Sequence, residues 1–336
     1  RSIESDVQSA ISEVLVQGDF ILGPHLEAFE REFAAFVGVE QAVGVSTGLD
    51  ALRLSLQALG IGPGDEVIVP ASTYVATALA VSAVGARLVL ADCDANTGNL
   101  DGAAFRAAIT PRTRAVIPVH LAGQPADMQP ILECAAASGI VVIEDAAQAH
   151  GAIDRGGSPC GSMGALGCFS FYPGKNLGAY GDGGLVTTQD SALADKLRRL
   201  RNYGQRVKYD HVEKGGNYRL DGLQAAVLSV KLKRLGGWTA ARGRHAAEYR
   251  RRLAGVGDLR FQAERPGSLH VYHLFFIETQ RRDELQKHLA REGIETGIHY
   301  PKAVHEQDCY ADLGCKPGAF PNAERRARRT LSLPMF

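Results

Sequence analysis

A single lysine lies among glycines in the segment FSFYPGKNLGAYGDGG, residues 169–184. This residue, Lys175, is the only lysine among the first 195 residues, although the chain has 28 arginines and 9 lysines. A guanidinium stays protonated and cannot act as a nucleophile or a proton carrier, whereas an amine can once burial lowers its pKa. The sequence therefore predicts a reactive amine at Lys175.

A carboxylate ends an apolar run in VVIEDAAQAHGA, residues 141–152. The charge of Asp145 is costly to bury unless a partner stabilises it. A protonated pyridine nitrogen would be such a partner, and Gln148, three residues further on, would then reach a ring hydroxyl. The alternative is an aspartate that caps the following helix.

Two further segments fit an anionic, planar ligand. In AVGVSTGLDALRLSLQALG, residues 42–60, Thr47 and Gly48 stand where a strand meets a helix, and hydroxyls and free amides at a helix start bind anions. Ser170 offers a further hydroxyl to a phosphate, and Tyr74 follows a strand and would stack on a planar ring. A plain helix cap at Thr47 and an ordinary packed tyrosine are the alternatives. With the lysine, these residues point to an anionic aromatic aldehyde as cofactor.

The elements that must position these residues alternate between apolar strands and helices. Strand-like runs occupy residues 65–70, 86–92, 114–120 and 139–145, and helix-like stretches lie between them. This alternation predicts an α/β fold with a mostly parallel sheet that is covered on both faces. Ligands of such sheets bind beyond the carboxyl ends of the strands, where His120 and Asp145 stand.

Two domains are expected, a large one over residues 1–239 and a small C-terminal α/β domain over residues 240–336. A long helical stretch at 220–255 contains Gly236 and Gly237, which are expected to bend or break it. A strand and a helix are expected after it, at residues 271–279 and 281–293.

Composition limits the class of protein. The chain of 336 residues is 45% hydrophobic with zero formal net charge, which gives no support for a nucleic acid or a membrane as partner. Its six cysteines form no C-x-x-C pair and its histidines show no metal-ligand spacing. We therefore expect no metal site, and reduced thiols in a cytoplasmic protein. The arginine clusters at 250–252 and 325–329 are interpreted as solvated helix faces.

Three motifs in one order carry a family resemblance: EDAAQAHGA, FSFYPGKNLGAYGDGG and N-x-R-L-D-x-L-Q-A-A. With the segments at 18–38 and 320–336, they resemble the sugar aminotransferases of the DegT/DnrJ/EryC1/StrS family over nearly the whole chain. Those enzymes use pyridoxal 5'-phosphate (PLP) and have PLP-dependent fold type I, the fold of aspartate aminotransferase. The resemblance implies that fold here, with a large PLP-binding domain and a small C-terminal domain.

The resemblance also implies roles for individual residues. Lys175 would form the covalent bond to the cofactor aldehyde, and Asp145 would pair with the pyridine nitrogen. Asn217 would reach the phosphate from the neighbouring subunit, so a homodimer with two shared active sites is implied. The other cofactor contacts would be Thr47, Gly48, Tyr74, Gln148 and Ser170, and the substrate contacts Tyr209, His211, Arg219, His299 and Tyr300.

The implied reaction is a two-stage transamination through pyridoxamine 5'-phosphate (PMP), with glutamate as the amino donor and a nucleotide-linked ketosugar as the acceptor. The patterns HLxGQPADM, FYPGKNLGAxGDGG and YGxxxKYxH resemble the branch that aminates carbon 3 of dTDP-3-keto-6-deoxyhexoses. Ala122 replaces the tyrosine usual in that branch, and Gly216-Asn217-Tyr218 replaces Tyr-Asn-Ser, so the sugar stays open.

Four alternatives remain. A carbon-4 aminotransferase of the same family is the nearest, although such enzymes more often carry GEGG where this chain has GDGG, residues 181–184. A non-catalytic ligand-sensing homologue is disfavoured because both Lys175 and Asp145 are present. A 3-dehydratase would have histidine in place of Lys175. A nicotinamide dehydrogenase would need a strand–GxGxxG–helix unit, and GIGPG at 60–64 precedes a strand instead.

Overall fold

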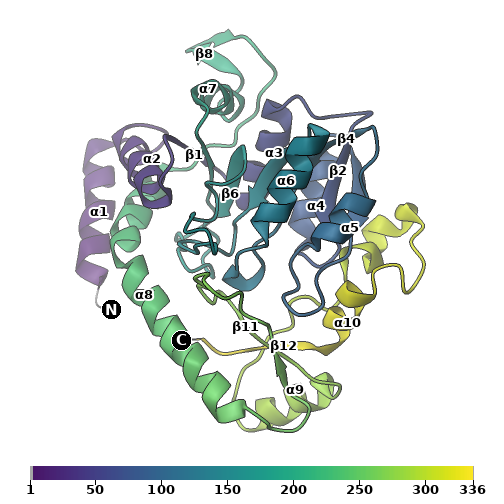
Figure 1. Cartoon of the computed structure of the whole chain (residues 1–336). Coiled ribbons are helices and arrows are strands. Elements are labelled where there is room, and N and C mark those ends of the chain that lie inside the picture. Colours follow the sequence, from purple (N-terminus) through teal and green to yellow (C-terminus); the bar gives the residue numbers. More distant parts are fainter. Residues whose placement is uncertain (1–2, 336) are drawn as a thin grey trace.

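The computed structural model describes residues 3–335, and its centre is a seven-stranded sheet with the order β1-β7-β6-β5-β4-β2-β3 (Figure 1). The strands from β2 to β6 pair in parallel, and β7 is antiparallel to both β6 and β1. The predicted α/β class with a mostly parallel sheet is confirmed. The strands are β1 (Gln41–Val45), β2 (Glu66–Pro70), β3 (Arg87–Ala91), β4 (Thr113–Val116), β5 (Val141–Asp145), β6 (Leu166–Ser170) and β7 (Gly184–Thr188).

The four strands expected from apolar runs are β2, β3, β4 and β5, and most of their residues are buried. The antiparallel strand β7 was not predicted. It follows β6 through a segment without helix, residues 171–183, and a parallel connection would need a crossover helix there. The lysine segment is therefore a loop between two antiparallel neighbours.

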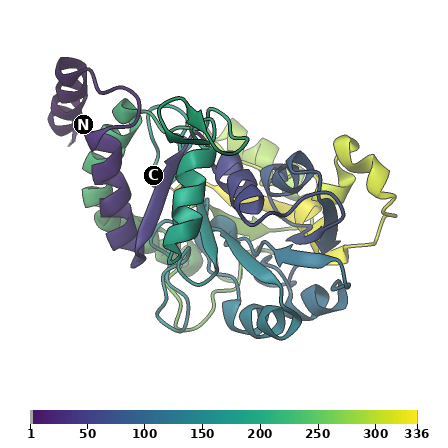
Figure 2. The ribbon, with the colours of Figure 1, turned by 90° about the horizontal axis from the view of Figure 1, so that it is seen from above.

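Helices cover both faces of this sheet, as Figure 2 shows from above. One face packs against α3, α4 and α7, and the other against α2, α5, α6 and α8. Aromatic rings fill the core beneath α2, where Phe33 lies edge-on to Phe169 and Phe171. The helices of this part are α1 (Glu4–Gln17), α2 (Pro24–Val37), α3 (Gly48–Ala58), α4 (Val75–Ala83), α5 (Gly102–Ala107), α6 (Met128–Ser138) and α7 (Ser191–Leu200).

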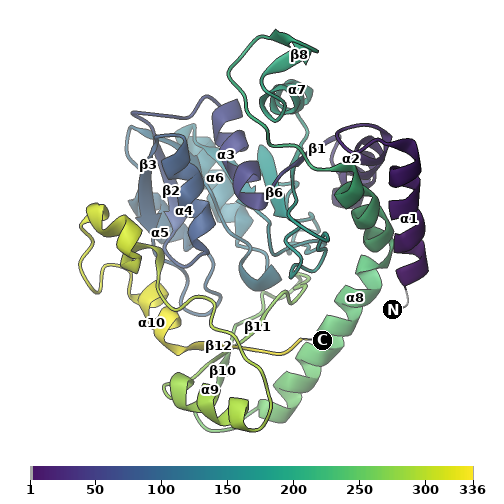
Figure 3. The same cartoon turned by 180° about the vertical axis from the view of Figure 1, so that it is seen from behind.

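The long helix α8 (Gly222–Leu253) runs from the large sheet to a smaller one (Figure 3). The break allowed for at Gly236 and Gly237 is wrong, because α8 is continuous through both. A Cβ atom at either glycine would have no neighbour within 4 Å, and the flanking residues Leu235 and Trp238 pack against the core beneath α2. The expected domain boundary at 239/240 falls inside α8, and the division into two domains stays a prediction.

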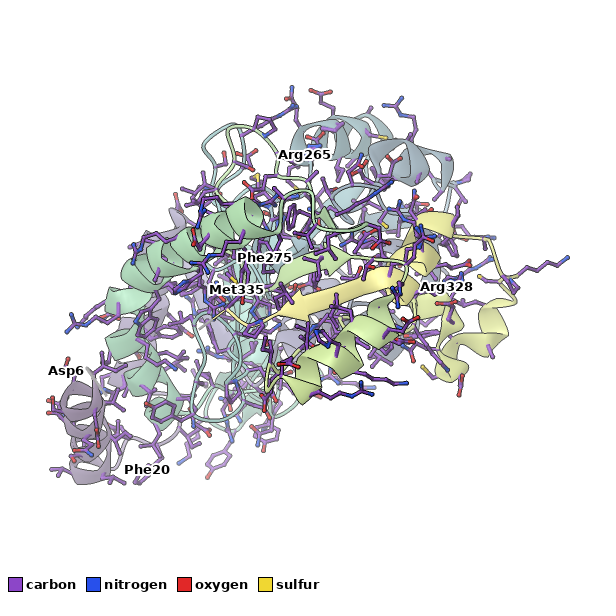
Figure 4. The ribbon with its side chains drawn as sticks, turned by 90° about the horizontal axis from the view of Figure 1, so that it is seen from below. Asp6, Phe20, Arg265, Phe275, Arg328 and Met335 are labelled. Carbon is purple, nitrogen blue, oxygen red and sulfur yellow. The ribbon has the colours of Figure 1, made fainter. Side chains whose placement is uncertain are left out.

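The small sheet has the order β10-β11-β12, with β10 (Arg260–Phe261), β11 (Phe275–Glu278) and β12 (Thr330–Leu333). In Figure 4, Phe275 and Met335 lie between this sheet and α8, and both belong to one hydrophobic cluster. The remaining elements are α9 (Arg282–Arg291), α10 (Pro321–Arg329), the hairpin β8 (Gln205–Val207) with β9 (Asp210–His211), and short 3-10 turns η1 (Leu121–Gly123), η2 (Val304–Glu306) and η3 (Asp308–Leu313).

One part of the arginine interpretation is wrong. Arg326 of α10 is buried, and its guanidinium forms an ion pair with Glu278 at 2.9 Å and lies over the ring of Phe276. Arg326 therefore joins α10 to β11 rather than facing water. Within residues 3–335, no helix is long and apolar enough to cross a membrane.

Candidate active site

The reactive groups predicted from sequence gather at the carboxyl ends of β5 and β6. Asp145 is the last residue of β5 and pairs in register with Cys168 of β6. Lys175 lies in the loop after β6, and its backbone N–H donates to the Tyr172 carbonyl at 2.8 Å. No hydrogen bond or ion pair of the Lys175 Nζ atom is found within residues 3–335.

Burial gives the Lys175 amine unusual acidity. Removal from water lowers the pKa of Lys175 from 10.5 to about 8, and the nearby charge of Asp145 acts in the opposite direction. Burial disfavours the charged form of an amine, so a substantial fraction of the neutral amine exists near neutral pH. The predicted reactive amine has the environment that such reactivity requires.

Asp145 is buried and is held from two sides. The Thr77 hydroxyl donates to Oδ2 at 2.8 Å, and the Ala147 N–H donates to Oδ1 at 3.2 Å. Burial raises the pKa of the Asp145 carboxyl, while the Thr77 and Ala147 hydrogen bonds and the charge of Lys175 lower it. An ionised carboxylate at this place is stabilised by a cationic partner, as the sequence predicted.

Gln148 connects this carboxylate region to Ala122 and Tyr300. Its Oε1 accepts from the Ala122 N–H at 2.6 Å, and its Nε2 donates to the Tyr300 hydroxyl at 3.1 Å. The rings of Tyr300 and Tyr74 lie 5.2 Å apart at 38°. Tyr74 is 54% exposed, so most of its ring is free to cover a planar ligand. Ala122 is fully buried in a hydrophobic cluster with Phe276, so the missing tyrosine leaves no open space there.

The start of α3 is the place where the sequence predicts an anion site. Thr47 is the N-cap, and its Oγ1 accepts from the Asp50 N–H at 3.0 Å, so the plain-cap interpretation of Thr47 is confirmed, whereas the anion site stays a prediction. Gly48 follows, and a Cβ atom there would stand 2.6 Å from the Ser170 Cβ. The first-turn N–H groups of a helix have no intrahelical partner and attract anions. Gly48 thus brings this helix start against the Ser170 hydroxyl.

Three histidines beside Lys175 complete the surroundings of the amine, and His150 and His273 were not predicted as site residues. His273 Nδ1 lies 3.4 Å from Asn176 Oδ1, and His299 Nδ1 lies 2.8 Å from Ser332 Oγ. Burial, and then the charge of Lys175, lowers the pKa of all three, to about 3 for His150. The signal for His150 was its place in EDAAQAHGA, five residues after Asp145, whereas His273 lies in a segment without any motif.

His120, expected at a strand end, lies outside the group around Lys175. Its Nε2 contacts Glu144 Oε2 at 2.9 Å, and its Nδ1 accepts from the Ala126 N–H at 3.0 Å. Glu144 also accepts from the N–H groups of residues 161, 163 and 164 at 2.7–2.8 Å. This buried carboxylate shapes the loop that leads into β6, and its role was not predicted.

Four predicted site residues stand away from Lys175 within this chain. Tyr209 is 80% exposed on the β8–β9 hairpin, which projects from the top of the molecule in Figure 1. His211 Nδ1 contacts the Tyr203 carbonyl at 2.8 Å, and Arg219 donates to Asn202 Oδ1 at 2.9 Å. Asn217 is exposed. Tyr209, His211 and Asn217 are exposed and Arg219 is half-buried, and none of the four contacts the group around Lys175 within residues 3–335.

One group of metal-ligand types lies elsewhere in the described residues. Atoms of His305, Glu306 and Glu324 come within 4.8 Å of one another. The Arg328 guanidinium contacts Glu324 at 2.8 Å and Glu306 at 3.8 Å. A cation is thus already supplied by the chain, and we assign no metal to this group.

Comparison with known proteins identifies the family. The chain matches the DegT/DnrJ/EryC1/StrS aminotransferase family over residues 1–336. It is 50% identical over 335 residues to dTDP-3-amino-3,4,6-trideoxy-alpha-D-glucose transaminase of Streptomyces venezuelae, which covers 100% of this chain and 88% of the relative. It is 49% identical over 333 residues to the erythromycin biosynthesis sensory transduction protein EryC1 of Saccharopolyspora erythraea, which covers 99% of this chain and 91% of the relative.

Solved structures agree with the predicted fold type I. DesV of S. venezuelae, in complex with a ketimine intermediate, superimposes with a TM-score of 0.97 at 50% identity and covers 99% of this chain and 90% of its own. NtdA of Bacillus subtilis, with bound cofactor PMP, gives a TM-score of 0.92 at 32% identity, and the match covers 100% of this chain and 78% of the NtdA chain. The predicted PLP-dependent fold is confirmed, and the chain belongs to the DegT/DnrJ/EryC1/StrS aminotransferase family.

Proposed function

We propose that this chain is a PLP-dependent aminotransferase that transfers an amino group from glutamate to carbon 3 of a dTDP-linked 3-keto-6-deoxyhexose. The observation that carries the proposal is the desolvated amine of Lys175, whose pKa is about 8, beside the buried carboxylate of Asp145. The transaminase from S. venezuelae, at 50% identity over the whole chain, supports the choice of sugar and of carbon 3.

The residues fit PLP at each of its functional groups. Lys175 would hold the aldehyde carbon and Asp145 the ring nitrogen, while Tyr74 would cover the ring and Gln148 would reach the ring oxygen. Thr47, Gly48 and Ser170 would hold the phosphate at the start of α3, where a side chain at position 48 would clash with Ser170. Bound there, PLP supplies an electron sink for the α-carbon of the amino donor.

Proton transfer falls to Lys175. With a pKa of about 8, its amine is basic enough to take a proton from the α-carbon of the donor and acidic enough to return it. Asp145 keeps the ring nitrogen protonated because an ionised carboxylate stabilises an adjacent cation. The ketosugar would lie beside Tyr300, whose hydroxyl accepts from the Gln148 amide at 3.1 Å.

We propose a homodimer in the cytoplasm, with Asn217, Tyr209, His211 and Arg219 serving the active site of the partner subunit. The exposure of Tyr209, His211 and Asn217 supports this assignment, because Tyr209 and His211 lie on a projecting hairpin and side chains there can reach beyond their own chain. The six cysteines are unpaired, which supports a reducing compartment. His299 and Tyr300 would contact the sugar from the same chain as Lys175.

Mixing two inactive variants tests the shared site. A hybrid of Lys175→Ala and Asn217→Ala subunits contains one intact site if Asn217 acts across the dimer, and none if it acts within its own chain. Recovery of activity on mixing, after subunit exchange, is therefore expected. Persistent inactivity of a hybrid whose formation is verified by native mass spectrometry would contradict the assignment of Asn217.

A ligand sensor is the second candidate, because a relative at 49% identity is named a sensory transduction protein. The two candidates differ in one spectrum. An aminotransferase with bound PLP loses its visible absorbance when glutamate is added, whereas a sensor keeps it with every amino acid. The poised amine of Lys175 favours the enzyme.

The decisive experiment is a screen of dTDP-ketosugars with glutamate, followed by NMR of the product. We expect an amine at carbon 3. An amine at carbon 4 would overturn the regiochemistry and leave the aminotransferase assignment intact. Lys175→Ala is expected to abolish turnover, and Lys196→Ala is the matched control, because Lys196 Nζ donates to the Ala58 carbonyl at 2.8 Å outside the site.

A further inference from the structure

Two threonines at the start of α4, Thr73 just before the helix and Thr77 in its first turn, form a hydrogen-bond chain that ends on Asp145. Thr73 Oγ1 lies 2.9 Å from Thr77 Oγ1, and Thr77 Oγ1 lies 2.8 Å from Asp145 Oδ2. Thr73 is 5% exposed and Thr77 is 1% exposed. Water therefore does not compete for these hydroxyls, and their hydrogen bonds are made inside the protein.

The direction of the chain follows from the number of hydrogens. A hydroxyl has one hydrogen to donate, and an ionised carboxylate only accepts. When Thr77 donates to Asp145, the Thr73 hydroxyl must supply the hydrogen between the two threonines. The Tyr74 carbonyl, 3.2 Å from Thr77 Oγ1, is a second acceptor for the Thr77 hydrogen, but the bond to the carboxylate is shorter and charge-assisted.

The start of α4 brings together three features that would act on the cofactor: the positive end of the helix dipole, the Tyr74 ring and the Thr77 hydroxyl. Helix α4 begins at Val75, so Thr77 lies in its first turn and Tyr74 is its N-cap. The positive end of a helix dipole stabilises a nearby carboxylate. The stacking ring of Tyr74 and the hydroxyl of Thr77 are thereby fixed by one local structure, against a carboxylate that comes 68 residues later in the chain.

We infer that Thr77, supported by Thr73, is a positioning residue that holds the Asp145 carboxylate ionised and aimed at the nitrogen of the cofactor ring. The inference rests on the role proposed above for Asp145. The Ala147 N–H donates only to Oδ1 of Asp145, at 3.2 Å. Without the Thr77 hydroxyl, Oδ2 of this buried carboxylate would lose its hydrogen bond of 2.8 Å. The carboxyl would then take up a proton more readily and would pair less well with a pyridinium.

Thr77→Val tests the inference because it keeps the shape of the side chain and removes the hydroxyl. We expect PLP to bind roughly 10- to 100-fold more weakly, as for a lost hydrogen bond to a buried charge. We also expect the pH at which the absorbance of the bound cofactor changes to rise, because a less protonated ring withdraws fewer electrons. Thr77→Ser keeps the hydroxyl and is expected to bind PLP within about threefold of the wild type.

Thr188→Val is the matched control, because it removes the hydroxyl of another buried threonine. The Thr188 hydroxyl donates to the Ala165 carbonyl at 2.8 Å, away from the site. Its PLP affinity should be unchanged. Thr73→Val, with Thr77 intact, is expected to shift the same absorbance transition in the same direction by a smaller amount. It keeps the test available if Thr77→Val does not fold.

A double-mutant cycle with Asp145→Asn distinguishes positioning from general structural damage. Thr77→Val should weaken PLP binding in the wild-type background and change it little in the Asp145→Asn background. Equal losses in both backgrounds, or a Thr77→Val protein with wild-type PLP affinity and absorbance, would overturn the inference. Failure of the wild-type protein to bind PLP would instead overturn the proposed function, so the two failures are distinguishable.

Discussion

The acidity of Lys175 can be measured directly in the protein without cofactor. With a pKa of about 8, about a tenth of the Lys175 amines are neutral at pH 7. An ordinary lysine with a pKa near 10.4 has about 0.04% neutral amine at that pH, so the neutral fraction of Lys175 is roughly 200-fold higher. Removal from water lowers this pKa, and the charge of Asp145 opposes that effect.

Competitive labelling with trace acetic anhydride measures this amine. The apoprotein is labelled from pH 6 to pH 11 together with N-acetyl-lysine amide as an internal standard, and the peptide that contains Lys175 is quantified by mass spectrometry. We expect half-maximal labelling near pH 8 for Lys175. A midpoint at or above pH 10 would refute the reasoning, because the amine would then be fully hydrated.

Asp145→Asn gives the sign of the electrostatic contribution. The negative charge of Asp145 raises the pKa of Lys175, so its removal should move the labelling midpoint below the wild-type value. Folding linkage provides an independent check. Because the unfolded chain binds more protons than the folded one between pH 8 and pH 10.5, wild-type stability relative to Lys175→Met should rise across that range, by about 3 kcal/mol.

Three further substitutions have expected results. Gly48→Ala would bring a methyl group within 2.6 Å of the Ser170 Cβ, so PLP affinity measured by equilibrium dialysis should fall roughly 10-fold. At Gly237, an added methyl group meets no atom within 4 Å, so Gly237→Ala should raise the free energy of unfolding in urea by about 0.5–1 kcal/mol. Tyr300→Phe removes the acceptor of the Gln148 amide, so kcat/KM for the ketosugar should fall roughly fivefold, and unchanged kinetics would contradict the assigned contact.

The strands β2, β3, β4 and β5 could be predicted because most of their residues are apolar and buried in the sheet. A strand such as β5 is then a continuous apolar run, and its single carboxylate, Asp145, stands out at the end. Lys175 stands out for the same kind of reason, since it is an exception to the arginine usage of the chain. Sequence therefore located the two charges of the site and the sheet edge on which they lie.

The partners of those charges could not be predicted, because they come from distant parts of the chain. Thr77 precedes Asp145 by 68 residues, and its segment reads as an ordinary apolar helix start. His273 lies 97 residues after Asn176, next to the small sheet. Local patterns report which residues one helix or strand buries, and they carry no information on which of two distant elements will meet.

The long helix shows a different limit. Gly236 and Gly237 lower helix propensity by about 1 kcal/mol each, and the sequence interpretation gave this cost too much weight. Helix α8 packs against α1 and α2 at one end and contributes Ala246 to the cluster around Phe275 at the other. Packing at both ends fixes the middle of the helix, so the local penalty is offset without a break.

The neutral histidines decide which group carries the proton in the proposed reaction. A general base is most effective when its pKa lies near the working pH. Lys175, with a pKa of about 8, satisfies this condition. Burial lowers the pKa of His150 to about 3 and also keeps the pKa values of His273 and His299 below the ordinary value. A protonated imidazole beside Lys175 would also repel a protonated amine. Burial thus removes the histidines as competitors for the proton, and leaves the amine of Lys175 facing the single carboxylate of Asp145.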